Sequence, residues 1–443
     1  MRFIERVRKF IAGRRGRVQV SSSPEAIADL PIESVAEPPP VRPKPPALHG
    51  PQTFVVLGMM TRHPVAGIVW LTMQYVIGLA RLGYEVYYIE AHGGTPKSFM
   101  RDDDDGSRAA TAFLDRVFTR FGLERRWAYQ AFHSDGQCYG MSEGTVRKLY
   151  RDAALILNLH GGTTPRPEHS ETGRLAYVGT DPVDREVALD QNDPDIVQLF
   201  AAHSAFFTWG ENYGKPDCKV PFSTRFHLVP TRQPVVLDFW EPNGMPPCGS
   251  FTTVGSWRQL WREITLDGEQ YAWSKHHEFL KFVDLPSRTA QEFELALGGC
   301  EGEDRALLEK KGWKVRDGLA LSADVDDYRA YIIGSRAEFT VAKDQNVRLR
   351  SGWFSDRSAT YLAAGRPVIT QDTGFGNILP LGEGLFAFSA LPEIVAAVEC
   401  INANYAKHSR GAMAIAREYF SYDRVLPKML AHAGVSRPPG AHA

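Results

Sequence analysis

The chain has 443 residues, 51 basic and 52 acidic side chains, a net charge of −1 and 43% hydrophobic content. This length accommodates two domains with separate cores, and the balanced charge argues against nucleic acid as a partner. Five scattered cysteines without a CxxC pair argue against a disulfide framework or a zinc site, and they indicate a reducing, cytoplasmic location.

The first 50 residues are predicted to form a basic and Pro-rich tail outside the folded part. Residues 1–17 combine apolar side chains at helical spacing, such as Phe3, Val7 and Phe10, with several arginines. Two interpretations stay open: peripheral contact of residues 1–17 with the inner membrane face, and a basic tail without a partner. No apolar run of about 18 residues is present to span a bilayer.

The folded part is predicted to begin with a buried strand at 53–58. An apolar helical stretch follows as far as Ala80, and a second strand at 85–89 comes directly after it. Strand, helix and strand in this order form a βαβ unit, which predicts parallel pairing. The acidic run at 102–105 is interpreted as a solvated loop, because a metal site needs converging ligands rather than a run.

Polar residues follow three further strands of the first half. His160 comes directly after the strand at 153–159, Asp181 follows the strand at 175–179, and Glu211 and Asn212 follow a strand that ends at Trp209. A residue at the carboxyl end of a parallel strand points into the ligand crevice, so we expect these side chains at a site or a hinge. Capping and turn formation explain Asp181, Glu211 and Asn212 equally well.

A Pro- and Gly-rich segment at 230–249 predicts a domain boundary, and the pattern of strands and helices restarts after it. A strand is predicted at 251–254, a helix at 285–297 and further strands at 313–315, 335–341 and 385–388. This alternation predicts a second doubly wound α/β domain. We therefore expect a first domain at 51–240, a second at 241–420, and a crossover helix with a disordered end at 421–443.

The segment 351–377 reads as loop, helix, strand and glycine loop, an order that suits an anionic ligand. The amide groups at a helix start near Asp356 attract a phosphate with roughly 1 kcal/mol, and Arg357 adds a planar fork of donors. The glycine loop beyond the strand lets the backbone approach a ligand closely. Its residues are Asp372, Thr373, Gly374, Phe375, Gly376 and Asn377.

This segment resembles the nucleotide-sugar half of GT-B glycosyltransferases. The matching residues are the helix end and strand entry at 363–368 and the glycine loop at 373–377. Retaining members usually carry two glutamates eight residues apart here, whereas Gly352 and Thr360 occupy those positions in this chain. The resemblance implies two Rossmann-like domains facing each other across a cleft, with Asp356 and Arg357 taking over part of the glutamates' role.

The same resemblance implies roles for residues elsewhere in the chain. Gly255 and Arg258 match a turn that contacts the donor diphosphate, and Lys275 resembles its partner lysine. His160 matches a histidine near the transferred sugar. His63 and Gly67 would lie at the mouth of the cleft, on the acceptor side with Asp181, Glu211 and Asn212.

Together these features predict a metal-independent glycosyltransferase that moves a sugar from a nucleotide-sugar donor to a glycan, lipid, protein or small-molecule acceptor. His160 and Asp356 are the expected catalytic residues, and no cofactor is expected because the nucleotide sugar is a substrate. Two alternatives stay open: a sugar-nucleotide epimerase or hydrolase of the same fold, and a non-catalytic, membrane-tethered partner of another transferase. A two-domain solute-binding protein would share the α/β pattern but would need an export signal.

Overall fold

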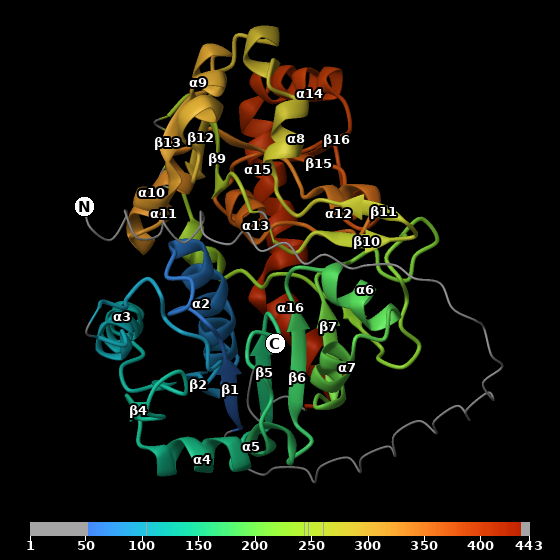
Figure 1. Ribbon diagram of the computed structural model, residues 1–443. Helices are drawn as coiled ribbons and strands as arrows, with labels where there is room; N and C mark the ends of the chain where they lie inside the picture. The colour runs from blue at the N-terminus through green and yellow to red at the C-terminus, as the bar shows by residue number, and fades with distance from the viewer. Residues whose placement is uncertain (1–51, 103, 243, 247, 260, 436–443) are drawn as a thin grey trace, which may run out of the picture.

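The computed structural model describes residues 52–435 apart from positions 103, 243, 247 and 260. The predicted tail and its membrane contact therefore lie outside the described residues. Within residues 52–435, no helix combines the length and the apolar character that crossing a bilayer requires. The predicted architecture is confirmed: two sheets of mainly parallel strands, each covered by helices, lie one above the other in Figure 1.

The first sheet has eight strands in the order β4-β3-β2-β1-β5-β6-β7-β8. Its strands are β1 (Thr53–Leu57), β2 (Glu85–Glu90), β3 (Trp127–Gln130), β4 (Cys138–Tyr139), β5 (Leu155–Leu159), β6 (Leu175–Gly179), β7 (Ala205–Thr208) and β8 (Val229–Pro230). All neighbours pair in parallel except β3 with β4. The parallel pairing predicted for the first βαβ unit is confirmed, with Phe54 opposite Val86 on one side and Leu155 on the other.

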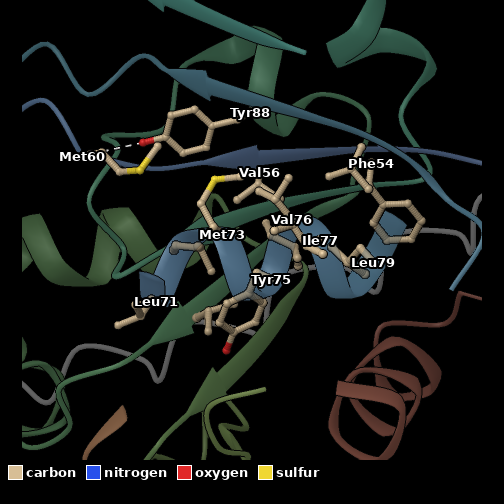
Figure 2. Packing of buried hydrophobic residues seen from close by; sticks show 14 of the residues in the cluster. Phe54, Val56, Met60, Leu71, Met73, Tyr75, Val76, Ile77, Leu79 and Tyr88 are labelled. Atoms are coloured by element: carbon tan, nitrogen blue, oxygen red, sulfur yellow. Dashed lines mark hydrogen bonds between the residues drawn. The ribbon is translucent and has the colours of Figure 1, made fainter. Parts of the chain in front are cut away.

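The helices of the first half cover this sheet and connect its strands. They are α2 (Ala66–Arg81), α3 (Ser107–Arg120), α4 (Glu143–Asp152), α5 (Pro167–Ser170), α6 (Asp184–Asp190), α7 (Pro194–Ala201) and the 3₁₀ turn η1 (Leu237–Trp240). Figure 2 shows α2 lying along β1, with Val76 and Leu79 packed towards Val56 and Phe54. Each such fully buried aliphatic side chain contributes about 1.5–3 kcal/mol. This packing fixes the position of β1 in the sheet.

The second sheet has six parallel strands in the order β13-β12-β9-β14-β15-β16. They are β9 (Phe251–Ser256), β12 (Phe293–Gly298), β13 (Lys314–Asp317), β14 (Ala337–Thr340), β15 (Val368–Gln371) and β16 (Leu385–Phe388); β10 (Ile264–Leu266) and β11 (Glu269–Tyr271) form a separate hairpin. The helix predicted at 285–297 is wrong, because only the turn η2 (Leu285–Arg288) is helical and β12 follows it. Pairing with β9 and β13 overrides the helix preference of Glu294, Leu295 and Ala296.

The helices of the second half flank this sheet, and the last one leaves it. They are α8 (His276–Lys281), α9 (Gly302–Lys310), α10 (Gly318–Leu321), α11 (Val325–Gly334), α12 (Asp344–Arg348), α13 (Asp356–Ala363), η3 (Phe375–Asn377), α14 (Leu391–Ala403), α15 (Tyr405–Ile415), the π-helical turn η4 (Ala416–Phe420) and α16 (Tyr422–His432). Leu426 of α16 is fully buried in the same core as Phe54 of β1. A Cβ on Gly78 of α2 would lie only 2.8 Å from the Leu426 side chain, so glycine permits this close contact. The last helix of the described residues therefore packs on the first half.

Candidate active site

A cleft of about 2100 Å³ lies between the two halves. Its walls come from the carboxyl ends of strands in both sheets. His160 and Asp181 follow β5 and β6 of the first sheet, while Gly255 ends β9 of the second. Ligands of doubly wound sheets bind at these ends, so the cleft is the candidate site.

His160 lies on the first-half wall in a strained backbone conformation. Its φ is +61°, a left-handed value that costs a non-glycine residue about 1–2 kcal/mol. Its Nδ1 lies 2.6 Å from the Thr180 hydroxyl, while Nε2 has no hydrogen-bond partner among the described residues. Burial lowers the pKa of His160 to about 4, so its ring is neutral near pH 7. The side chain thus presents one unsatisfied ring nitrogen.

Asp181 and Lys343 join the two walls beside His160. The Lys343 Nζ lies 2.6 Å from the Asp181 carboxylate and 3.2 Å from the centre of the Trp273 ring. Burial would raise the pKa of Asp181, but the ammonium of Lys343 and the guanidinium of Arg262 hold it below the usual value. Asp181, which the sequence predicted on the acceptor side, therefore contacts the second half as well.

Arg357 lines the cleft at the first turn of α13, but its fork is occupied by protein acceptors. Nε donates to the Glu338 carboxylate at 2.6 Å, one Nη to the Val254 carbonyl at 2.8 Å and the other to the Thr340 hydroxyl at 2.9 Å. Glu338 is fully buried, so this pair is enclosed in the sheet. Each Nη keeps one further N–H. The predicted contact of Arg357 with a diphosphate is therefore confined to those two groups.

Asp356 precedes Arg357 at the first position of α13, and it also lines the cleft. Burial raises its pKa above the usual aspartate value, and the neighbouring Arg357 only partly offsets this rise. Arg258 lines the same wall near Gly255, where the Asp304 carboxylate holds its guanidinium at 2.7 and 3.0 Å. The structure therefore brings Asp356, Arg357, Gly255 and Arg258 to one wall, and their contact with a donor stays a prediction.

Lys275 lies behind this wall rather than in its lining. Its Nζ is 5.2 Å from the centre of the Trp353 ring, and no carboxylate of the described residues lies within 4.0 Å of it. Burial lowers its pKa well below the usual lysine value, and the nearby Arg357 and Lys343 lower it further. Lys275 therefore has no ion-pair partner among the described residues, and its charged form is disfavoured.

The glycine loop at 372–377 lies outside the lining of the cleft. The Gly374 amide donates to the Asp372 carboxylate at 2.8 Å, and the Asp372 carboxylate pairs with Arg350 at 2.8 Å. Phe375 is buried, and Asn377 donates to the Asn212 side chain at 3.0 Å. The remaining loop residues are Thr373, which donates to the Trp353 carbonyl, and Gly376. The loop contacts the first half here, and a contact with the donor stays a prediction.

The predicted acceptor-side residues divide into two groups. His63 and Gly67 line the cleft with Asp181, and burial lowers the pKa of His63 to about 4. Glu211 and Asn212 lie outside the lining. Glu211 pairs with Arg232, and burial raises its pKa to about 7. Asn212 contacts Arg350 and Asn377 of the second half, which fits the hinge alternative rather than a site.

Sequence reasoning missed three residues of the second-half wall: Arg262, Trp273 and Lys343. Arg262 lies 3.7 Å from Asp184 of the first half, and its guanidinium lies 4.8 Å from the centre of the Trp273 ring. Lys343 follows β14 within three residues, so the strand-end rule could have found it. Arg262 and Trp273 come from the segment around the β10–β11 hairpin, which carried no recognised signal.

Comparisons with known proteins support the fold. No protein-family profile and no curated protein matches the chain. Similar solved structures include Anabaena HepE in complex with UDP (12% identity, 86% of this chain and 99% of that chain, TM-score 0.51). They also include the pneumococcal O-GlcNAc transferase GtfA in complex with UDP and GlcNAc (11%, 87% and 99%, TM-score 0.51). A third is an alpha-glucosyltransferase in complex with UDP and a DNA 13-mer containing an HMU base (8%, 87% and 100%, TM-score 0.52). The chain has the GT-B fold of these glycosyltransferases.

Proposed function

We propose that the protein is a glycosyltransferase that takes a sugar from a nucleoside-diphosphate sugar of the UDP class. The arrangement of charges in the cleft carries the proposal: Arg258, Arg262 and Lys343 line the second-half wall, and His160 lines the opposite one. Lys275, next to this wall, has no ion-pair partner among the described residues. UDP is bound in all three structures described above, which supports this donor class.

In the proposed reaction, an acceptor hydroxyl oxygen forms the new bond to the anomeric carbon as the bond from that carbon to the diphosphate breaks. The diphosphate leaves with the bonding electron pair, and the hydroxyl proton passes to the departing phosphate. Fixed cations stabilise the charge that develops on the leaving group, and we propose that they do so without a metal ion. Lys275 is proposed to join them although it lies outside the cleft lining, because a nearby phosphate would stabilise the ammonium form that burial disfavours.

His160 is proposed to contact the transferred sugar. Its Nε2 has no hydrogen-bond partner among the described residues, and its Nδ1 lies 2.6 Å from the Thr180 hydroxyl. The ring is neutral because burial lowers its pKa, so it can form one hydrogen bond with a sugar hydroxyl without adding charge. Asp356, whose pKa is raised by burial, is proposed to hold a second hydroxyl.

A thermal-shift panel tests the proposal on the full chain, with UDP, ADP and GDP, their sugars, and each of them with EDTA. A ligand at 100 times its dissociation constant stabilises by about 2.7 kcal/mol, so a shift identifies the base. Arg262→Gln should reduce the UDP shift. Arg305→Gln on α9, a surface arginine paired with Glu309, should leave it unchanged.

Release of UDP from the responding sugar nucleotide then tests for an enzyme. Turnover that depends on an added acceptor supports a transferase, whereas an isomerised sugar nucleotide would favour an epimerase. Stabilisation by UDP without turnover of any sugar nucleotide would favour the non-catalytic alternative. No shift with any nucleotide would overturn the proposal.

A further inference from the structure

A second cavity lies beside the cleft, between α3 of the first half and the turn before α11 of the second. Its volume is about 420 Å³, within the range of roughly 300–1,000 Å³ typical of small-ligand pockets. Pro64 and Ala323 line both this cavity, called the side groove below, and the cleft. A molecule held in the cleft can therefore extend into the side groove.

The side groove is lined almost entirely by apolar side chains. They are Pro64, Phe99, Ala109, Ala112, Phe113 and Ala323. The rings of Phe99 and Phe113 lie 5.5 Å apart, and both side chains stay partly exposed. The core-facing residues of α3, among them Ala110 and Leu114, are buried separately in the first-half core. Phe99 and Phe113 pack against the edge of that core and leave part of their surface exposed, and together with Ala109 and Ala112 they form an apolar strip along the side groove.

Two arginines without counter-charges flank this apolar strip. Arg116 of α3 lines the side groove, and Arg62 lines the adjoining cleft two residues before Pro64. No carboxylate of the described residues lies within 4.0 Å of either guanidinium. Arg120, one turn further along α3, is different because it pairs with Asp326 at 2.6 Å. A ligand that fits the side groove therefore combines a hydrocarbon group with an anionic group.

We propose that the acceptor is an anionic amphiphile, an inference that rests on the glycosyl transfer proposed above. Its hydrocarbon chain occupies the side groove, its anionic group lies between Arg62 and Arg116, and its hydroxyl reaches the cleft. This places the acceptor on the first-half side, next to His63, and leaves the second-half cations to the donor. The hydrocarbon excludes water from Phe99 and Phe113, and the anion pairs with the arginines.

Calorimetric titration of the full chain with decyl phosphate, below its critical micelle concentration, tests this inference. Decyl phosphate should bind at least tenfold more tightly than inorganic phosphate or decyl maltoside, which carry only one of its two features. Ala112→Trp fills the side groove and should weaken binding at least tenfold, and Arg116→Gln should weaken it about fivefold. Ala396→Trp on α14 and Arg108→Gln on α3 change exposed residues that line neither cavity, so they should leave binding unchanged.

Equal binding by wild type, Ala112→Trp and Arg116→Gln would show adsorption elsewhere and overturn the inference. Binding to phosphatidylglycerol vesicles but not to dissolved decyl phosphate would make the bilayer the ligand, and it would also overturn it. If Ala112→Trp does not fold, Ala112→Phe provides the smaller blocking variant.

UDP binding is measured in parallel on the same variants. UDP binding without decyl phosphate binding removes this inference and leaves the proposed function standing. Decyl phosphate binding without UDP binding keeps the side groove as an amphiphile site and removes its assignment to a transferase acceptor.

Discussion

The two walls of the cleft differ in how their charged and polar groups are held. On the second-half wall, Arg357 has three protein acceptors, Arg258 pairs with Asp304, and Lys343 pairs with Asp181 across the cleft. On the first-half wall, Arg62 has no counter-charge and His160 Nε2 no hydrogen-bond partner among the described residues. The side chains of the second wall are therefore held in place by protein contacts before any ligand binds. The first wall keeps a charge and a hydrogen-bonding atom that a ligand can pair with.

This difference matches the two tasks that the proposal assigns. A leaving diphosphate is stabilised best by cations whose positions are fixed in advance, because no reorganisation is then needed. An acceptor, by contrast, must be recognised through groups that the protein leaves open. The predictions below test this division, beginning with the largest expected effect.

Arg357→Ala should lower the free energy of unfolding by about 3–5 kcal/mol, because it leaves the buried Glu338 carboxylate without its partner. Urea denaturation measures this change. Arg305→Ala breaks an exposed pair with Glu309 and should change stability by less than about 1 kcal/mol. Equal stability of the two variants would contradict the view that Arg357 is a structural element of the second wall. It would also make Arg357→Ala a direct test of donor binding.

Lys275→Gln should weaken UDP binding by about 10- to 100-fold, the value of one charge-assisted phosphate contact of roughly 1.5–3 kcal/mol. Stability should not fall, since the substitution removes a half-buried amine that has no ion-pair partner among the described residues. In the wild type, UDP affinity should decrease as pH rises, because the lowered pKa of Lys275 lets its ammonium lose a proton. Calorimetry measures both effects. Lys310→Gln, an exposed residue of α9, is the matched control, and equal affinities of the two variants would remove Lys275 from the donor site.

His203 should make the first half sensitive to acid. Its Nδ1 donates to the Leu199 carbonyl at 2.8 Å, and its Nε2 accepts from Asn158 at 3.1 Å, so protonation would place two donors against each other. Burial lowers its pKa from 6.5 to about 4. The unfolded chain therefore takes up this proton first, and stability falls as pH drops from 6.5 to 4, by about 1.4 kcal/mol per pH unit.

His203→Gln removes this titration, so the slope of stability against pH in urea denaturation should decrease by that amount. His432→Gln is the control, because His432 is an exposed residue of α16. An unchanged slope in His203→Gln would contradict the assigned neutral form.

Thr180→Val should have the smallest effect. It removes the hydrogen-bond partner of His160 Nδ1, a contact of about 0.5–1.5 kcal/mol, and should lower the rate of UDP release by roughly 2- to 10-fold. Initial rates with the responding sugar nucleotide measure it, and Thr111→Val on the exposed side of α3 is the control. A rate equal to the control would show that Thr180 does not orient the His160 ring.

Much of this fold could be predicted from local patterns, because buried parallel strands and their connecting helices have strong periodicity. His160 and Asp181 were found because each follows a strand of the parallel sheet. Residues in that position lie at the carboxyl edge of the sheet, which here lines the cleft. Strand β12 was missed because Glu294, Leu295 and Ala296 favour a helix and only pairing with β9 decides otherwise. The partner strand lies outside the local window, so local sequence patterns do not reveal the pairing.

Charge pairing was equally invisible in the sequence. The Arg357 fork suggested donors free to bind phosphate, yet its acceptors on Glu338 and Val254 lie 19 and 103 residues away in the chain. Lys343 and Asp181 are separated by a whole domain before they meet. Motifs identify which residues can bind an anion, whereas the tertiary structure determines which of them are already occupied.

The contact between α16 and α2 has a consequence for the synthesis of the protein. Leu426 belongs to the first-half core, and Gly78 of α2 is shaped to receive it. A ribosome therefore completes the first sheet long before it delivers the helix that seals that half. During this interval the α2 surface stays uncovered, and we expect chaperones to bind it. Nascent chains ending at residue 420 should accordingly be more sensitive to protease within residues 66–81 than the full chain.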